Sequence, residues 1–366
     1  MNTYRNPSLL FTITTVIILI FQNLLAQKLI KFDNTSISFD KRWEEAINKI
    51  DNESVWIGYS IKRLMSEHSY IGNSNADESR PSLQDVIDGK VDIRSTIGRG
   101  EEDRHFYWND EESIEKVLKD IGILIQVNKD KTISSVKLNS LSLPFDLNGI
   151  SLYWLGEAKY DESVALLKKL FGKVNDTEIK EDLITAVGIH ENSSTGYGFL
   201  EDIIFSKEDN DVREQAVFWI AQHDNSKVLE LMKKVANEDN SEDVREKAIF
   251  GLYMINTDES TDEIIELARN SKWMHIRKQA IFWLGQTASK KAISVLNDAV
   301  YDDEETEIQN QAVFALSQLK KDESIPSLIK VAKTHPNPEV RKKAIFWLGQ
   351  TEDDRALDAI ISFLKD

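Results

Sequence analysis

A repeat of 32 residues constrains the fold of this chain more than any other feature of its sequence. Five segments align without gaps and each carries alanine at its fourth position; they begin at Arg213, Arg245, Arg277, Gln309 and Arg341. Two weaker copies, at 150–157 and 179–188, precede them and bring the count to seven. A constant period of 20–50 residues is typical of chains that stack one structural unit on the next.

Each copy has the pattern of two helices. In the copy at Arg213, Val212, Ala216 and Ile220 recur at helical spacing, and Val217 and Phe218 make the opposite side apolar as well. After a short polar turn, a second apolar face follows at Val228, Leu229, Met232 and Val235. One helix pair cannot bury two apolar faces alone, whereas a stack of pairs can. The sequence therefore predicts a mainly α-helical solenoid over residues 150–366.

The repeat carries a family resemblance. The run from Glu339, Val340 and Arg341 to Leu348 and Gly349 resembles the short HEAT-like repeat, which also occurs in phycobilin-lyase-type proteins. The resemblance implies an armadillo-like α-solenoid of antiparallel helix pairs. It implies little about function, because function depends on sites carried by a fold rather than on the fold.

One position of the repeat alternates between large and small residues along the chain. The seven copies carry Trp154, Ala186, Trp219, Gly251, Trp283, Ala315 and Trp347. Because close packing requires compensation of volume, we expect each indole to lie over the small residue of the neighbouring first helix. A row of indoles that grips a ligand is the alternative.

A row of phenylalanines accompanies this alternation, at Phe218, Phe250, Phe282, Phe314 and Phe346. We expect these rings to pack against the adjacent first helix. The alternative is an exposed apolar stripe that binds a partner, since contiguous exposed apolar patches mark interaction sites.

Residues 1–26 have the pattern of a secretory signal peptide. Arg5 precedes an apolar run of thirteen residues, 9–21, and the small residue Ala26 stands before Gln27. We expect cleavage between Ala26 and Gln27, a periplasmic or secreted mature protein and no membrane span after cleavage. An uncleaved membrane anchor is the alternative, although the run is shorter than the roughly 20 residues that a span needs.

Residues 27–149 lack the repeat and predict a small α+β domain that caps the solenoid. The pattern indicates a helix over 38–50, a strand over 55–61, a hairpin of strands near 123–127 and 133–138, and a long loop over 64–104. The order of these elements, followed by YWLGEAKYDESVALL, resembles the N-terminal part of bacterial envelope HEAT-repeat proteins.

Composition argues against several classes of function. The formal charge of −17 would repel a phosphate backbone, so nucleic-acid binding is not expected. Cysteine is absent, which excludes disulfides, thiolate nucleophiles and cysteine-ligated zinc. HEAT-like iron hydroxylases place several His-Glu pairs at equivalent repeat positions, whereas this chain has one, His190-Glu191. We therefore expect no metal and no cofactor.

These observations favour a non-enzymatic scaffold of the cell envelope that holds a protein segment on the concave, second-helix face. The candidate contacts are polar residues predicted on the second helices: Glu230, Lys233, Lys234, Glu263, Glu266, Lys330 and Lys333. An accessory enzyme of the lyase or hydroxylase type is the alternative.

Overall fold

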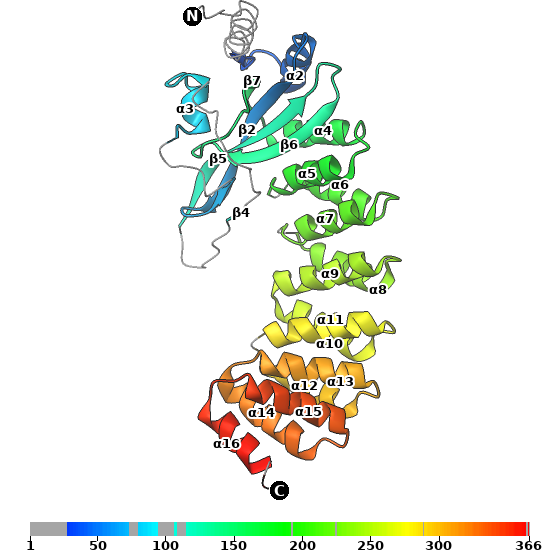
Figure 1. Ribbon diagram of the computed structural model, residues 1–366. Coiled ribbons are helices and arrows are strands. Elements are labelled where there is room, and N and C mark those ends of the chain that lie inside the picture. The colour runs from blue at the N-terminus through cyan, green and yellow to red at the C-terminus, as the bar shows by residue number, and fades with distance from the viewer. Residues whose placement is uncertain are drawn as a thin grey trace, which may run out of the picture. The chain divides into compact units, whose positions relative to one another are not determined.

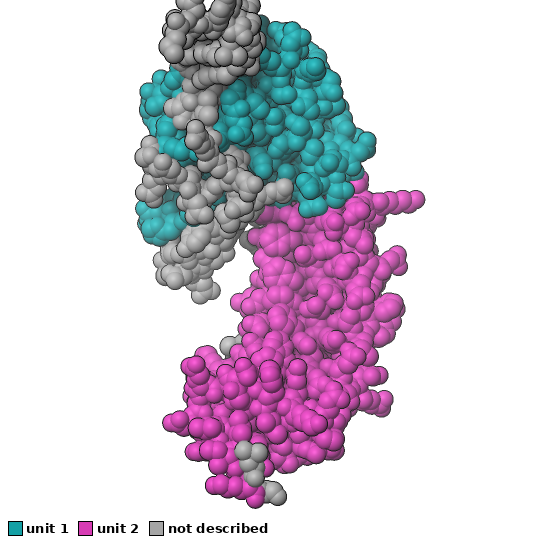
Figure 2. Space-filling model, in the orientation of Figure 1, with its two compact units in different colours: residues 1–199 teal, residues 200–366 magenta. Residues whose placement is uncertain are grey.

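The computed structural model describes residues 28–72, 80–93, 106–107, 115–191, 193–223, 225–287, 289–363 and 365. The chain forms two compact units, residues 1–199 and 200–366, coloured separately in Figure 2. The sequence placed a boundary at residue 149 instead. The predicted signal peptide and its cleavage site before Gln27 lie outside the described residues.

A five-stranded sheet forms the centre of the first unit (Figure 1). Its order is β1 (Leu29–Lys31), β7 (Ser151–Glu157), β2 (Val55–Ser66), β5 (Lys116–Val127) and β6 (Ile133–Ser140). Strands β2, β5 and β6 pair antiparallel, whereas β7 runs parallel to both β1 and β2. A second, two-stranded sheet pairs β3 (Tyr70–Ile71) with β4 (Phe106–Tyr107).

Helices cover both faces of the five-stranded sheet, because its central strands bury residues on both sides. On one face, Tyr59 of β2 contacts the ring of Phe39 in α2 (Phe39–Asn48) and hydrogen-bonds Ser163 in α4 (Tyr160–Phe171) at 2.8 Å. On the other face, Trp56 and Trp154 share an apolar cluster with α3 (Leu83–Ile87).

The predicted elements of the N-terminal region are confirmed, with one correction. The helix begins after the N-cap Ser38, the strand begins at Val55, and β5 and β6 form the predicted hairpin. The proposed loop over 64–104 is wrong in part. Strand β2 continues to Ser66, and β3 and α3 also lie within that range.

The prediction that 150–157 is the first helix of a repeat is wrong, because these residues form strand β7. Four consecutive residues from Leu152 to Leu155 are buried, as expected for a parallel strand covered on both faces. Such a short apolar run looks the same as part of a buried helix. Trp154 is therefore a sheet residue, and it pairs in register with Gly58, whose missing side chain leaves room for the indole.

The repeats form six helix pairs rather than seven, among the fifteen helices of the described residues. Each pair has a first and a second helix, and the bounds are α5 (Thr177–Gly188) with α6 (Ser194–Ile204), α7 (Asn210–Ile220) with α8 (Val228–Glu238), α9 (Glu242–Ile255) with α10 (Asp258–Asn270), α11 (Met274–Gln286) with α12 (Lys290–Asp302), α13 (Thr306–Ser317) with α14 (Lys321–Thr334), and α15 (Pro338–Gly349) with α16 (Asp354–Phe363).

Local sequence explains where several first helices start. The side chains of Asp209, Ser241 and Asn337 act as N-caps, accepting hydrogen bonds from backbone N–H groups in the first turn. These residues stand at equivalent positions of the repeat, and Pro338 adds a first residue without an N–H to satisfy. The five alanines of the repeat are fully buried, which lets neighbouring helices approach closely.

The phenylalanine row packs between neighbouring first helices, as expected. Phe218 stacks on Phe250, and Phe282 stacks on Phe314, each at 6.3 Å between ring centroids. These four rings are partly buried, whereas Phe346 is 52% exposed.

The indoles have different neighbours from those predicted. Trp283 contacts the rings of Phe250 and Tyr253, and Trp347 contacts Phe314. A Cβ atom placed on Gly251 would lie closest to the side chains of Met232 and Ala221.

Ala315 packs closely against the preceding first helix. Its backbone and its Cβ lie against Gly285 of the preceding first helix. Trp219 is buried, whereas Trp283 and Trp347 are partly buried. The close packing of α11 against α13 therefore includes direct contact between a glycine and an alanine.

Candidate functional site

The second helices of the repeats present a polar face opposite their buried apolar face. In α8, Leu231, Met232 and Val235 are buried, whereas Glu230 and Lys234 are exposed. The seven predicted contact residues all lie on α8, α10 or α14. Five of them are exposed, and two, Lys233 and Glu263, are partly buried; the exposed ones are Glu230, Lys234, Glu266, Lys330 and Lys333.

An ion-pair network joins three of the predicted residues. The Nζ of Lys233 lies 3.3 Å from Glu230 on the same helix and 3.5 Å from Glu263 on the next second helix. Burial lowers the pKa of Lys233, but its hydrogen bond to Glu230 and the attraction of Glu263 outweigh this and raise the pKa overall. Lys233 is therefore held in its charged form between two carboxylates.

The predicted lysines also contact aromatic rings on neighbouring second helices. The Nζ of Lys234 lies 4.6 Å from the ring centre of Phe205, and that of Lys330 lies 5.3 Å from the ring centre of Tyr301. Lys333 lies over Phe363 at 5.7 Å. Such cation–π contacts hold a flexible lysine in one place while its charge stays near water.

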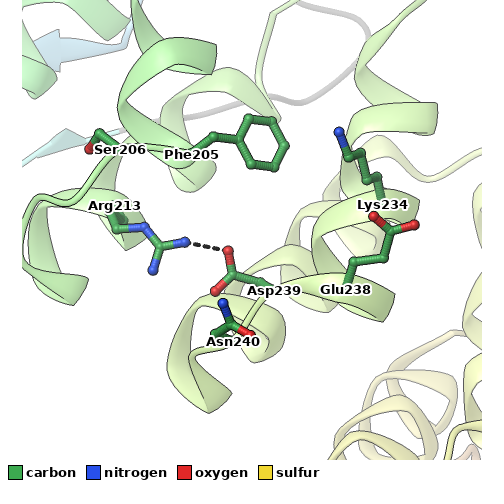
Figure 3. A pocket seen from close by; sticks show the side chains of 7 residues that line it. All are labelled: Phe205, Ser206, Arg213, Lys234, Glu238, Asp239 and Asn240. Atoms are coloured by element: carbon green, nitrogen blue, oxygen red, sulfur yellow. Dashed lines mark hydrogen bonds and ion pairs between the residues drawn. The ribbon is translucent and has the colours of Figure 1, made fainter.

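A hollow of about 270 Å³ lies beside Lys234, and we call it the first hollow (Figure 3). Its lining comes from the C-terminal ends of α6 and α8 and from α7: Phe205, Ser206, Arg213, Lys234, Glu238, Asp239 and Asn240. Phe205 is 47% exposed. In Figure 3 the ring of Phe205 and the ammonium of Lys234 point toward one another across the hollow.

A buried ion pair forms the base of the first hollow. Arg213 pairs with Asp239, and the two side chains are only 12% and 4% exposed. Arg213 also donates to the carbonyl of Ile204 at 2.8 Å and to Asn210 at 3.3 Å. These bonds fix the base, so the residues available to a ligand are those of the rim: Phe205, Lys234 and Glu238.

A second hollow of about 290 Å³ lies between α10 and α12, and we call it the second hollow. It is lined by Ala268, Arg269, Val295, Asp298, Ala299, Asp302 and Asp303. Arg269 and Asp298 pair across it at 3.0 Å, and Asp303 lies 3.7 Å from Arg277, which corresponds to Arg213.

The two hollows are the same place in the repeat, two repeats apart. The four positions that they share differ by 64 residues in sequence: Phe205 and Arg269, Lys234 and Asp298, Glu238 and Asp302, and Asp239 and Asp303. Both hollows have an aspartate at the base, Asp239 or Asp303. At the rim, an aromatic residue is replaced by Arg269 and a lysine by Asp298. The second-helix face therefore offers one hollow with an aromatic, mixed-charge rim and one with a predominantly acidic rim.

The histidine-glutamate pair is part of the first unit's internal packing. His190 is fully buried, where its Nδ1 lies 3.2 Å from the carbonyl of Val187 and its ring contacts Tyr160 edge to face. Glu191 pairs with Arg63 at 3.1 Å. Among the described residues, no group of three or more His, Cys, Asp or Glu side chains is arranged to hold a metal ion. Within the same residues, no helix combines the length and apolar character needed to cross a membrane.

Family models match the repeat region directly. The model described as HEAT repeats matches residues 199–276 and 275–334, and the model described as PBS lyase HEAT-like repeat matches residues 340–366. The chain is a HEAT-like repeat protein. Its matched residues contain all seven predicted contact residues and both hollows.

Solved structures similar to this HEAT-like repeat protein have low sequence identity to it. Human deoxyhypusine hydroxylase is 15% identical, with 55% of this chain and 85% of that chain covered and a TM-score of 0.24. The phycocyanin lyase complex of CpcE and CpcF from a Nostoc species is 18% identical, with coverage of 55% and 80% and a TM-score of 0.33. Lipovitellin is 12% identical, with coverage of 66% and 35% and a TM-score of 0.38. No curated protein matches the chain.

Sequence reasoning missed several residues of this face of the HEAT-like repeat protein. Phe205, Arg269, Asp298 and Tyr301 were not among the predicted contacts, yet they line the hollows or pair with the predicted lysines. Three of them share one position of the repeat, so comparing the residues at that position in all copies would have identified them. Phe205, Asn237, Arg269, Tyr301 and Lys333 recur every 32 residues at the C-terminal ends of successive second helices.

Proposed function

We propose that this HEAT-like repeat protein is a non-enzymatic scaffold that holds an extended segment of another protein along its second helices. The observation that carries the proposal is the recurrence of the hollow between second helices at an interval of two repeats. A ligand with its own regular spacing, such as an extended polypeptide, meets equivalent positions on such a surface one after another.

The chemistry of the second-helix face supports a protein ligand. Exposed lysines and carboxylates stand beside the exposed ring of Phe205, so the face carries both charge and apolar surface. Protein interfaces combine aromatic anchors with a polar rim in this way. The face is neither uniformly basic, as nucleic acid requires, nor uniformly apolar.

We further propose that the scaffold works outside the cytoplasm, in the cell envelope. The support is the signal-peptide pattern of residues 1–26. Mass spectrometry of the protein made in its natural host should find a chain that begins near Gln27. An intact Met1 in a soluble cytoplasmic fraction would contradict an envelope role.

Affinity capture with charge-reversed variants tests the scaffold function. The full-length protein is used to capture partners from an envelope extract, and the double variant Lys233→Glu/Lys234→Glu should retain much less of the partner. The control, Glu304→Lys/Glu305→Lys, reverses two charges in the turn before α13 and should lose much less of the partner. Equal loss from both variants would indicate nonspecific charge attraction and contradict the proposed site. Iron or a coloured chromophore bound to the purified protein would favour an accessory enzyme instead.

A further inference from the structure

We propose that the two hollows bind two side chains of one extended segment, a large apolar or aromatic side chain in the first hollow and a basic side chain in the second. This inference rests on the proposed scaffold function and specifies the partner's chemistry. It follows from the difference between two rims that stand at equivalent positions of the repeat.

The rim of the first hollow fits an uncharged, large side chain. Lys234 and Glu238 carry opposite charges, so neither a carboxylate nor an ammonium gains a net attraction there. The exposed ring of Phe205 and the methylene stem of Lys234 offer apolar surface instead. An aromatic or large aliphatic residue that enters this hollow buries apolar area against both of them.

The rim of the second hollow fits a long basic side chain. Two carboxylates, from Asp298 and Asp302, line the rim with the guanidinium of Arg269, and a third, from Asp303, lies at the base near Arg277. Ala268, Val295 and Ala299 supply apolar lining on which the methylenes of a lysine or arginine can lie. An incoming cation is thus attracted by the excess of carboxylates while its stem stays on apolar surface.

The separation of the hollows sets the spacing of the two side chains in the partner. Packed helices lie about 8–10 Å apart, so two helix-to-helix steps span about 16–20 Å. An extended chain rises about 3.3 Å per residue, and it covers that distance in about five or six residues.

The surface between the hollows suits a polypeptide backbone. The intermediate repeat carries Asn237 where the hollows have Phe205 and Arg269, and Asn270 where they have Glu238 and Asp302. Both asparagines are exposed. The Nδ2 of Asn237 donates to the carbonyl of Lys233, and the Nδ2 of Asn270 donates to Glu266, each at 2.9 Å. These bonds orient the two carboxamides, whose oxygens can accept hydrogen bonds from the N–H groups of a peptide.

A selection from random 12-residue peptides displayed on phage, with the purified protein as bait, tests this inference. We expect enriched peptides to carry a large apolar residue and a Lys or Arg five or six positions apart. The variant Phe205→Arg/Lys234→Asp gives the first hollow the rim of the second. It should select peptides with two basic residues at the same spacing, and should bind the original peptides about tenfold more weakly, as expected for the loss of an anchoring contact.

The controls separate the inference from the scaffold function on which it rests. The variant Lys342→Glu, on the exposed side of the first helix α15, should select the same peptides as the unmodified protein, and melting curves should show that both variants are folded. Enriched peptides without this spacing, or peptides that do not change with the rim variant, would overturn the inference and leave the scaffold function standing. A failure to enrich any peptide would contradict the scaffold function as well.

Discussion

The indole of Trp283 lies against the ring of Phe250 on the preceding first helix, with 4.9 Å between the ring centroids. Phe250 is thereby enclosed between Phe218 before it and Trp283 after it. Phe314 is enclosed in the same way, by Phe282 and Trp347. Aromatic contact between neighbouring first helices therefore follows the same two-repeat period as the two hollows on the second helices.

Removing the indole of Trp283 should destabilise the repeat unit by way of Phe250. We expect Trp283→Ala to lower the free energy of unfolding by up to about 3 kcal/mol, somewhat below the cost for a fully buried aromatic because Trp283 is partly exposed. A double-mutant cycle with Phe250→Ala, measured by urea unfolding, should give a coupling of about 0.5–1.5 kcal/mol. Strict additivity would show that the two rings do not stabilise one another.

Gly285 and Gly349 stand at the same repeat position, but only Gly285 lies in close contact with a neighbouring helix. A Cβ at Gly285 would lie 2.9 Å from backbone and side-chain atoms of Ala315, whereas one at Gly349, 64 residues on, has its nearest neighbour 4.0 Å away. We expect Gly285→Ala to cost about 1–3 kcal/mol through overpacking. Gly349→Ala, the matched control, should be neutral or stabilising by up to about 1 kcal/mol, since alanine favours the helix. Equal melting temperatures for the two variants would contradict the close approach of α11 and α13.

The ion pair at the base of the first hollow should matter far more for stability than the ion pair at the second. Asp239 is nearly buried, so Asp239→Ala leaves the charge of Arg213 uncompensated and should cost about 3–5 kcal/mol. Asp298 and Arg269 are each half exposed, and Asp298→Ala should cost less than about 1 kcal/mol. Chemical denaturation compares the two variants, and similar losses would show that the Arg213–Asp239 pair is not desolvated.

His275 should make stability fall as the solution becomes mildly acidic. Burial, and then the nearby charge of Arg245, hold the pKa of His275 below its ordinary 6.5, although Glu242 and Asp243 oppose this. Its Nε2 lies 3.0 Å from an Arg245 nitrogen and must be unprotonated to accept that hydrogen bond. Because the unfolded chain takes up a proton more readily, stability is complete above pH 6.5 and is lost as the pH falls toward the lower folded pKa.

The variant His275→Gln isolates this effect. We expect the loss of stability between about pH 8 and pH 5.5, measured by thermal melting, to be smaller in the variant than in the unmodified protein, since the glutamine does not titrate. The same slope in both proteins would place the pH dependence in other groups.

The solenoid could be predicted because five copies of one helix-pair pattern align without gaps, and stacking such pairs buries the apolar faces that one pair leaves exposed. Sequence reasoning misjudged 150–157, where a strand buried on both faces has the same short apolar run as a helix. It also misplaced the nearest neighbours of Gly251, because a repeat position fixes which helix a residue lies on and not which side chain reaches it.

The candidate site shows the same division between what a repeat pattern specifies and what it leaves open. That Lys234 is exposed on a second helix follows from periodicity alone. That it lies over Phe205 depends on how α6 and α8 pack, and Phe205 follows directly after Ile204, the last residue of α6. The hollows depend on two helices at once, so no single copy of the repeat predicts them.

Site-specific photo-crosslinking tests the central proposal, a protein segment held along the second helices, most directly. A benzoylphenylalanine is placed in the natural host at Glu266, exposed on α10 between the two hollows, or at Lys342, exposed on the first helix α15. We predict a crosslink from position 266 to one extended segment of a single partner protein, and little or none from position 342. Crosslinks from position 342 with none from position 266 would contradict binding on the second-helix face.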